Sequence, residues 1–444
     1  MSPIATRRGA PWPLSGCVGA PAKSARNSPS VSIFFIRLPS TQTNGNDSLI
    51  ENDLTRLPCF KQPLNGQGAP RLVAIGDIHG AIAEFKSILK TTGLADDSGR
   101  WTGGKAVLMQ TGDYMDRGAG TRAVLDLLMA LEQQAKDAGG RVFAGLGNHE
   151  AMNLIGETRD VTPEIVATFA DAQSESRRQA AWELYAKLAA AKAAKGEAVP
   201  AVYQQTRDAW LATHPPGYVE YREAIGPRGQ YGAWLRGKPI VAEYGGSIFM
   251  HAGIAPSLAP TKLDDLNDRV RDEVSRMDRF VQRLVDAKLA LPFFTLQEIL
   301  QVASNEIAVA NALMAAAKEG GQAPDRSKLD IPLLTEAQEI LKIAEWTVVN
   351  PEGALWYRGF ATLPDDPAGA PFAALLERYG AKRFVAGHTP QPGGRITVRY
   401  GGRVILIDTG MLAAVFKGRA SALEIDGEKL TAVYADGSAP IALR

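Results

Sequence analysis

The sequence predicts an α/β fold: two β-sheets packed face to face with helices outside, a four-layer αββα sandwich interrupted by two helical insertions. Two observations lead to this prediction. Several short apolar runs are followed at once by glycine and polar residues, as where strands of a sheet buried on both faces end. Helix-periodic blocks separate some of these runs. The runs are residues 72–75, 106–109, 142–146, 247–250 and 384–386.

The first two runs each lead into an expected helix. Apolar residues recur at helical spacing from Ile82 to Leu89, and again from Val124 to Leu131 before Gly139 and Gly140. Two successive strand–loop–helix units place both connecting loops at one edge of the sheet.

Two long helical blocks are expected to interrupt the core, over residues 156–238 and 257–349. In the first, Thr162 and Pro163 are an N-cap and a first-turn proline. In the second, an apolar stripe from Leu263 to Val285 predicts a long amphipathic helix, and Thr295 with Glu298 forms a capping box for another. Neither block carries its own ligand set, so we expect a cap over the core edge, with a plain scaffold as the alternative. Six aromatic residues of the first block could line this cap, although most are expected to pack: Trp182, Tyr185, Tyr218, Tyr221, Tyr231 and Trp234.

The rest of the chain returns to the core. A hairpin is expected from residue 240 to 250, a helix over 371–379, and further strands over 403–408 and 422–435. The catalytic domain is therefore expected over 66–437, followed by a tail, 438–444.

Composition excludes some partners and leaves localisation open. The net charge of +1 and pI of about 7.7 do not favour nucleic acid or an anionic surface. Residues 1–65 contain no acidic residue before Asp47 and are expected to be disordered or a targeting segment. The apolar run 31–36 is far below the roughly 20 residues that span a bilayer, so no transmembrane segment is expected. The protein would be cytoplasmic, or periplasmic if Arg7 and Arg8 belong to an export signal.

Five motifs hold four of the five histidines of the chain. They are GDIHG at 76–80, GDYMDRG at 112–118, GNHE at 147–150, HAG at 251–253 and GHTP at 387–390. Asp, His and Asn without thiolates suit divalent Mn, Fe or Zn. Two ions about 3.5–4 Å apart, bridged by one carboxylate, would activate water for phosphoester hydrolysis. Any one motif alone could instead be a helix-capping turn, but five in order favour a shared site. The fifth histidine, His214, lies in a Pro/Gly turn and is expected at the surface.

These motifs resemble the calcineurin-like metallophosphoesterases, and among them the phosphoprotein phosphatases. GNHEAMN, ALWYRG and GHTPQ are similar to the bacterial Shewanella-like protein phosphatases. Pro390 stands where many phosphodiesterases have a further histidine ligand, and Glu150 stands where diadenosine tetraphosphatases tend to have Asp. Both features favour the phosphoprotein phosphatase type.

The resemblance implies a role for ten residues. Asp77 and His79 would hold the first metal ion, and Asp113 would bridge to the second. Asn148, His251 and His388 would complete the second site. His149 would protonate the leaving oxygen with Asp116 orienting its ring, and Arg117 and Arg358 would bind the phosphate. The alternative for each arginine is a structural ion pair. Asp408 could touch the site but is expected to be a structural turn residue.

The expected function is metal-dependent hydrolysis of phosphomonoesters, on a phosphoprotein or phosphopeptide carrying phosphotyrosine, or phosphoserine and phosphothreonine. Two divalent ions are expected, manganese first, with iron and zinc open. One alternative is a small-molecule phosphatase for nucleotides or polyphosphates. The other is a non-catalytic, metal-stabilised scaffold that binds partners through the helical insertions.

Overall fold

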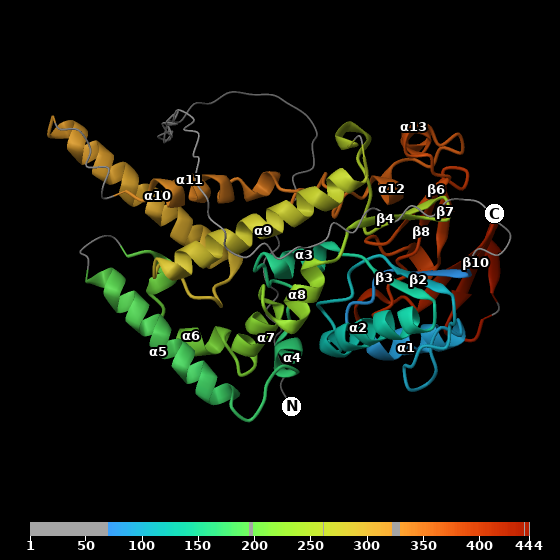
Figure 1. Cartoon of the computed structure of the whole chain (residues 1–444), viewed down its shortest axis with the longest axis horizontal. Coiled ribbons are helices and arrows are strands. Elements are labelled where there is room, and N and C mark those ends of the chain that lie inside the picture. Colours follow the sequence, from blue (N-terminus) through green and yellow to red (C-terminus); the bar gives the residue numbers. More distant parts are fainter. Residues whose placement is uncertain (1–69, 195–198, 261, 322–328, 439, 444) are drawn as a thin grey trace, which may run out of the picture. The chain divides into compact units, whose positions relative to one another are not determined.

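The computed structural model describes residues 70–194, 199–260, 262–321, 329–438 and 440–443 (Figure 1). All of them belong to one compact unit, Leu54–Arg444. The predictions for residues 1–65 lie outside the described residues.

The first sheet has six strands in the order β11-β10-β9-β1-β2-β3. The strands β1, β2 and β3 are parallel, whereas β9, β10 and β11 add in antiparallel fashion beside β1. Their bounds are β1 Leu72–Ile75, β2 Val107–Gln110, β3 Arg141–Ala144, β9 Ser421–Asp426, β10 Lys429–Tyr434 and β11 Ile441–Leu443. The strand β11 lies within the predicted tail, 438–444, where it pairs with the edge of β10.

The second sheet has five strands in the order β4-β5-β6-β8-β7. The strands β5, β6 and β8 are parallel, and antiparallel β4 and β7 flank them. Their bounds are β4 Val241–Tyr244, β5 Ser247–Met250, β6 Arg383–Ala386, β7 Thr397–Arg399 and β8 Val404–Leu406.

An apolar core joins the two sheets. Met109 of the first sheet belongs to the same buried cluster as Phe249 and Val385 of the second, and each is at most 2% exposed. Helices α1 (Ile82–Thr91) and α2 (Thr121–Asp137) pack on the first sheet, and α12 (Gly359–Thr362) lies beside β8 of the second. Burial of these facing side chains is the main force that holds the layers together. The predicted α/β fold with two sheets is confirmed.

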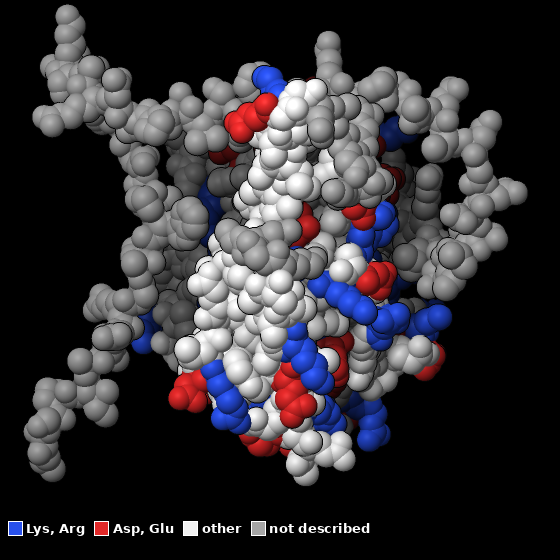
Figure 2. All heavy atoms as spheres, turned by 90° about the vertical axis from the view of Figure 1, so that its left-hand side faces the viewer, with Lys and Arg blue, Asp and Glu red and all other residues white. Residues whose placement is uncertain are grey.

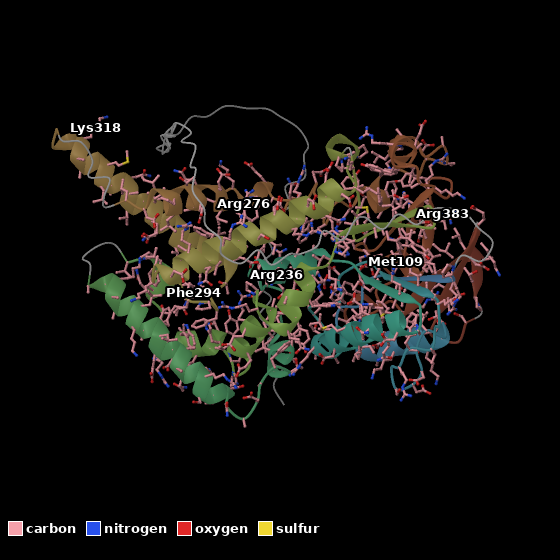
Figure 3. All side chains as sticks on the ribbon, in the orientation of Figure 1. Met109, Arg236, Arg276, Phe294, Lys318 and Arg383 are labelled. Carbon is pink, nitrogen blue, oxygen red and sulfur yellow. The ribbon has the colours of Figure 1, made fainter. Side chains whose placement is uncertain are left out.

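Helices fill both regions predicted as insertions, on the opposite side of Figure 1 from the sheets. Helix α3 follows β3, and the others come after it. The bounds of α3 and of the helices in the two regions are α3 Asn148–Leu154, α4 Pro163–Ala167, α5 Ser174–Ala193, α6 Arg207–Thr213, α7 Tyr218–Ile225, α8 Gln230–Arg236, α9 Asp264–Asp286, α10 Leu296–Glu319 and α11 Ile331–Ile340. Two further helices, α13 Ala370–Tyr379 and α14 Ala413–Phe416, belong to the returning core segment. In Figure 3, Met109 lies among the strands, whereas Arg236 and Phe294 lie among these helices.

Local signals account for several of these helices. The capping box at α10 forms as predicted, because the Glu298 side chain accepts the Thr295 N–H at 2.8 Å. Thr162 is the N-cap of α4 as predicted, and this helix ends at Ala167, before α5 begins at Ser174. Helix α10 is long and apolar enough to cross a membrane by length and composition alone, which is weak evidence, and 22% of its most apolar window is buried. Figure 2 shows charged side chains of both signs around uncharged surface on this side of the molecule.

The expectation that His214 lies at the surface is wrong. Its side chain is 4% exposed, and its ring stacks on Trp210 with centroids 3.9 Å apart. The rings of Trp210 on α6, Tyr218 at the start of α7 and Phe293 cover the imidazole, although Pro216 of the turn is exposed. The residue types of the turn alone do not reveal this packing.

Candidate metal centre

The five motifs meet where the strands of the two sheets end. The loops after β1, β2, β6 and β8 and the first turn of α3 supply polar side chains around a cavity of about 330 Å³. His251, after β5, contacts the cavity residues Asn148 and His388. The cavity is lined by Asp77, His79, Asp113, Arg117, Asn148, His149, Arg159, Asp160, Trp356, Arg358, His388, Pro390, Asp408 and Phe416. Polar groups from distant parts of the chain thus face one space, as in ligand sites at strand ends of α/β sheets.

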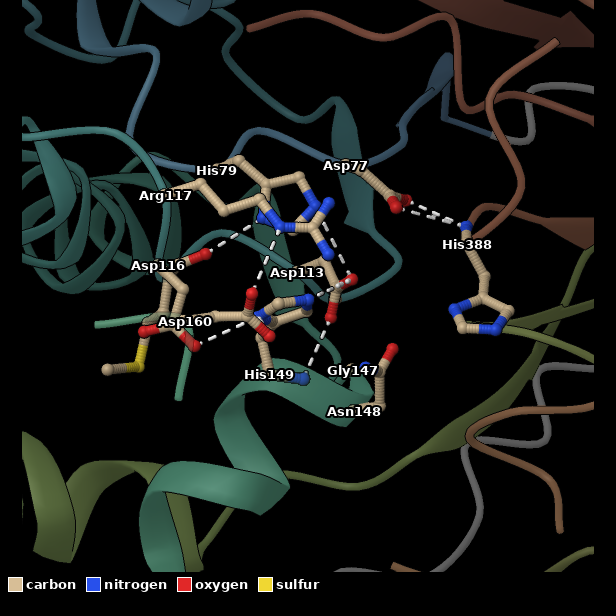
Figure 4. Close-up of polar contacts among 12 residues, drawn as sticks. Asp77, His79, Asp113, Asp116, Arg117, Gly147, Asn148, His149, Asp160 and His388 are labelled. Carbon is tan, nitrogen blue, oxygen red and sulfur yellow. Dashed lines mark hydrogen bonds and ion pairs between the residues drawn. The ribbon is translucent and has the colours of Figure 1, made fainter. Parts of the chain in front are cut away.

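Asp113 lies at the centre of the cluster (Figure 4). Its Oδ2 atom is 3.6 Å from Nε2 of His79, 3.3 Å from Nε2 of His251 and 3.8 Å from Nε2 of His149. Burial opposes the charge of this carboxylate, but the surrounding His251 and His149 rings hold the pKa of Asp113 well below its usual range. An ionised, 2% exposed carboxylate therefore faces three imidazole rings.

Three of the histidines contact backbone carbonyls through one ring nitrogen. Nδ1 of His79 lies 3.0 Å from Met115 O, Nδ1 of His251 lies 3.2 Å from Thr111 O, and Nε2 of His388 lies 3.1 Å from Trp356 O. Because a carbonyl oxygen only accepts, each of these nitrogens is the protonated donor of its ring. In a neutral ring the other nitrogen then carries a lone pair, the arrangement that orients histidine as a metal ligand.

Nitrogen and oxygen atoms of three side chains converge beside Asp113. Nε2 of His251 is 3.0 Å from Nδ1 of His388 and 2.8 Å from Oδ1 of Asn148. Burial lowers the pKa of His388 well below its ordinary value and that of His79 to about 3, which keeps both rings neutral. The donor set of Asp113, Asn148, His251 and His388 therefore fits a divalent metal ion.

Asp77 lies next to the backbone of His388. Its carboxylate oxygens accept the backbone N–H of His388 at 2.9 and 3.1 Å. Gly387 permits this approach, since a Cβ atom there would lie 2.2 Å from Oδ1 of Asp77. Asp408 also lines the cavity, and burial together with the Asp408 charge raises the pKa of Asp77 well above its usual range. Burial likewise raises the pKa of Asp408 to about 6. Asp408, expected to be a structural turn residue, is thus part of the cavity wall.

His149 and Asp116 form a buried pair. Nδ1 of His149 donates to Oδ2 of Asp116 at 2.8 Å, and both side chains are at most 2% exposed. Burial works against the charged ring, but Asp113 and Asp116 raise the pKa of His149 above its ordinary value. The ligand atoms of His79, Asp113 and His149 lie within 4.8 Å of one another, as do those of Asp113, His251 and His388. Both possible metal-holding groups therefore share Asp113.

Guanidinium groups line the cavity wall. The guanidinium carbon of Arg117 lies 5.2 Å from the ring centroid of Phe416. Nη1 of Arg358 donates to His388 O at 2.8 Å and Thr389 Oγ1 at 3.1 Å. A third arginine, Arg159, lies over the Trp356 ring at 5.6 Å. Arg159, Trp356 and Phe416 were not predicted as cavity residues, because no motif spacing relates these positions.

The motif loops hold uncommon backbone conformations. Within the described part of the chain, eight non-glycine residues have positive φ, and five of these lie in the motifs: His79, Asp113, Asp116, Arg117 and His388. Such conformations cost energy and tend to gather at functional sites. The surrounding hydrogen bonds hold them in place, among them those from Ile78 N and His79 N to Asp113 O, both 2.9 Å.

A family model described as calcineurin-like phosphoesterase matches residues 70–289. The chain contains a calcineurin-like metallophosphoesterase domain. This metallophosphoesterase belongs to a hydrolase family that binds divalent metals, and the predicted resemblance to the family is confirmed. The group of His79, Asp113 and His149 lies within the matched range, whereas the group of Asp113, His251 and His388 also includes a residue beyond it, His388.

Known proteins resemble this metallophosphoesterase to different extents. Shewanella-like protein phosphatase 2 of Arabidopsis thaliana is 43% identical over 99 residues, which cover 22% of this chain and 25% of that protein. Shewanella-like protein phosphatase 1 of Plasmodium berghei is 22% identical over 82% of this chain and 74% of its own. Among solved structures, the cold-active protein-tyrosine phosphatase of a Shewanella species aligns with a TM-score of 0.53 and 22% identity, covering 86% of this chain and 83% of that one. The last similarity supports the same fold.

Proposed function

We propose that this metallophosphoesterase hydrolyses phosphomonoesters of phosphoproteins or phosphopeptides with two divalent metal ions. The observation that carries the proposal is the convergence of histidine ring nitrogens and the Asn148 oxygen on the ionised Asp113 carboxylate. In the proposed arrangement Asp77, His79 and Asp113 hold one ion, while Asp113, Asn148, His251 and His388 hold the other. Manganese is our first expectation, and iron and zinc suit the same ligand set.

The bound ions would supply positive charge to the phosphoryl oxygens and lower the pKa of a water molecule that attacks the phosphorus. Protein side chains would orient the phosphate and protonate the leaving oxygen. Arg117 and Arg358 would orient the phosphate through their guanidinium forks, which match its oxygens better than a lysine does. Their placement on the cavity wall supports this role.

His149 would donate a proton to the leaving oxygen from Nε2. Its Nδ1–H is held by Asp116 at 2.8 Å, which fixes the ring and favours the protonated form. Because no protein nucleophile is required, we expect no covalent phosphoenzyme.

The names of the relatives support a phosphoprotein substrate, since two of them are called protein phosphatases and the structural neighbour is a protein-tyrosine phosphatase. We place phosphotyrosine first, because its phenolate leaves more easily than an alkoxide, and phosphoserine and phosphothreonine next. A small-molecule phosphatase and a metal-stabilised scaffold are the competing functions. The buried His149–Asp116 pair supports a catalyst, because a scaffold has no need of it.

The proposal is tested with purified protein stripped of metal and reloaded with Mn²⁺, Fe²⁺ or Zn²⁺. Phosphotyrosine, phosphoserine and phosphothreonine peptides are compared with nucleotides and polyphosphate by phosphate release, beside His149→Asn. We expect metal-dependent turnover of phosphopeptides, lowered about 10²-fold or more in the variant. Turnover confined to nucleotides or polyphosphate would favour the small-molecule alternative, and no turnover of any ester with any metal would favour the scaffold.

A further inference from the structure

A buried polar connection leads from helix α7 to the His149–Asp116 pair. The amide nitrogen of Asn153, on α3, donates to both carboxylate oxygens of Asp116 at 3.0 Å and to the backbone carbonyl of His149 at 2.9 Å. The oxygen of the same amide accepts the hydroxyl hydrogen of Tyr221, on α7. The exposed fractions of Asn153 and Tyr221 are 1% and 0%.

The Tyr221 hydroxyl determines which way this amide can point. With the observed orientation, the NH₂ group of Asn153 faces acceptors, and its carbonyl oxygen faces the Tyr221 donor. With the reversed orientation, the carbonyl oxygen would face the carboxylate of Asp116 and the carbonyl of His149, which are all acceptors. A buried polar group without a complementary partner costs the full penalty of its desolvation. Tyr221 therefore selects the orientation in which Asn153 supports Asp116.

Packing fixes Tyr221 itself. Its ring meets Phe169 edge-on, with centroids 5.0 Å apart and an interplanar angle of 83°. Tyr221 belongs to α7, and Phe169 follows α4. The segment predicted as an insertion is therefore linked, through Asn153, to the His149–Asp116 pair. The cavity lining does not include Tyr221, so this residue does not contact the substrate space.

We infer that Tyr221 and Asn153 are positioning residues for His149, holding Asp116 and the imidazole ring in the orientation that delivers a proton to the leaving oxygen. This inference rests on the proposed function, in which His149 is the acid. The helical segment then contributes to catalysis, because it affects the rate at which the enzyme cleaves esters whose leaving group needs a proton.

The test compares esters that differ in their need for an acid. The 4-nitrophenolate ion leaves from 4-nitrophenyl phosphate without a proton, whereas phenyl phosphate and a phosphoserine peptide have poorer leaving groups. For Tyr221→Phe at saturating Mn²⁺, we expect kcat to fall about tenfold on phenyl phosphate and further on the peptide, but no more than about twofold on 4-nitrophenyl phosphate. KM should stay unchanged, because phosphate binding is not touched.

Tyr185→Phe is the matched control. Tyr185 is also buried in the helical segment, at 1% exposure, and its hydroxyl donates to Val202 O at 2.9 Å, apart from the pair. Tyr185→Phe removes the same hydroxyl oxygen as Tyr221→Phe. The control should therefore show a comparable shift in Tm, but its kcat should not depend on the leaving group. Asn153→Ala should reproduce the pattern of Tyr221→Phe, and Tyr221→Phe should have no further effect in a His149→Asn background.

The outcomes separate the two proposals. Equal losses on 4-nitrophenyl and phenyl phosphate in Tyr221→Phe would assign this tyrosine a purely structural role and overturn the inference, as would unchanged rates on both. Failure of the wild-type protein to hydrolyse either ester with any metal would instead overturn the proposed function.

Discussion

The Glu150 carboxylate accepts the backbone N–H of Asp113 at 2.8 Å and so ties the first turn of α3 to the central loop of the metal centre. The same side chain accepts three further backbone N–H groups, those of Tyr114, Met115 and Gly147, at 2.8 to 3.0 Å. Glu150 is 0% exposed. Glu150 therefore holds two motif loops in register. The GNHE motif alone does not indicate this role.

Glu150→Gln should strongly destabilise the protein. Burial raises the pKa of this carboxyl to about 7, while the backbone N–H groups favour the ionised form. Glutamine offers one acceptor oxygen in place of two, and its NH₂ group would face backbone donors. We expect a loss of about 3 to 5 kcal/mol in the free energy of unfolding, measured in urea.

Glu183→Gln is the control for this substitution, because Glu183 is exposed on α5. It should stay within about 0.5 kcal/mol of the wild type. A Glu150→Gln protein as stable as that control would show that the four N–H bonds contribute little.

Arg117 and Arg358, two of the arginines that line the cavity, should differ from exposed arginines in their effect on phosphate binding. Arg117→Ala and Arg358→Ala each remove a charged donor, so kcat/KM should fall about 10- to 100-fold and the inhibition constant of inorganic phosphate should rise. Arg358→Lys should recover little, because a lysine cannot replace a fork that also donates to His388 O. The control is Arg100→Ala, which alters an exposed side chain outside the cavity lining. A phosphate inhibition constant that stays at the wild-type value in both alanine variants would contradict their assignment.

Local signals in the sequence predicted much of the fold. The strands β1 and β5 begin and end where expected, because each is a short apolar run that leads directly into a motif. Helix α9 follows its apolar stripe, and α10 begins at its capping box. Hydrophobic period and capping chemistry are encoded within a few residues, so they can be recognised without knowledge of the tertiary structure.

Features that depend on long-range packing could not be predicted in this way. The pairing of β11 with β10, the burial of His214 and the approach of Trp356 to His388 each join segments whose contact has no local signal. The motifs did indicate which residues meet, since glycine and acidic residues that follow several strands are expected to lie together at one edge of the sheet. They did not indicate the supporting residues Glu150, Asn153 and Tyr221, whose contacts arise only in the folded chain.

Metal removal should lower stability as well as activity. A metal at 100 times its dissociation constant stabilises a folded protein by about 2.7 kcal/mol per site, so chelation should lower Tm and Mn²⁺ should restore it. Asp113→Asn should remove most of the Mn²⁺-induced shift, because Asp113 belongs to both possible metal-holding groups. The control, Asp97→Asn, changes a carboxylate whose side chain is 81% exposed and should keep the full shift. A full shift in Asp113→Asn would place the metal elsewhere.

The buried His214 should make the protein less stable in mild acid. Burial lowers its pKa from 6.5 to about 4, with Arg178 adding to this effect and the contact of Nδ1 with Trp210 O opposing it. Among the described residues, Nε2 of this ring has no hydrogen-bond partner. Between these two pKa values the unfolded chain binds a proton that the folded protein does not, so stability falls as pH drops from 6.5 towards 4.

By this difference in pKa, the His214 contribution to the loss between pH 7.5 and 4.5 is about 2.5 kcal/mol. His214→Phe keeps an aromatic ring on Trp210 but cannot be protonated. Urea unfolding at both pH values should therefore show a loss that is smaller by about that amount in the variant, because the other titrating groups contribute equally to both proteins. If the wild type and His214→Phe lost the same stability over this range, His214 would have to be protonated as readily in the folded protein as in the unfolded chain.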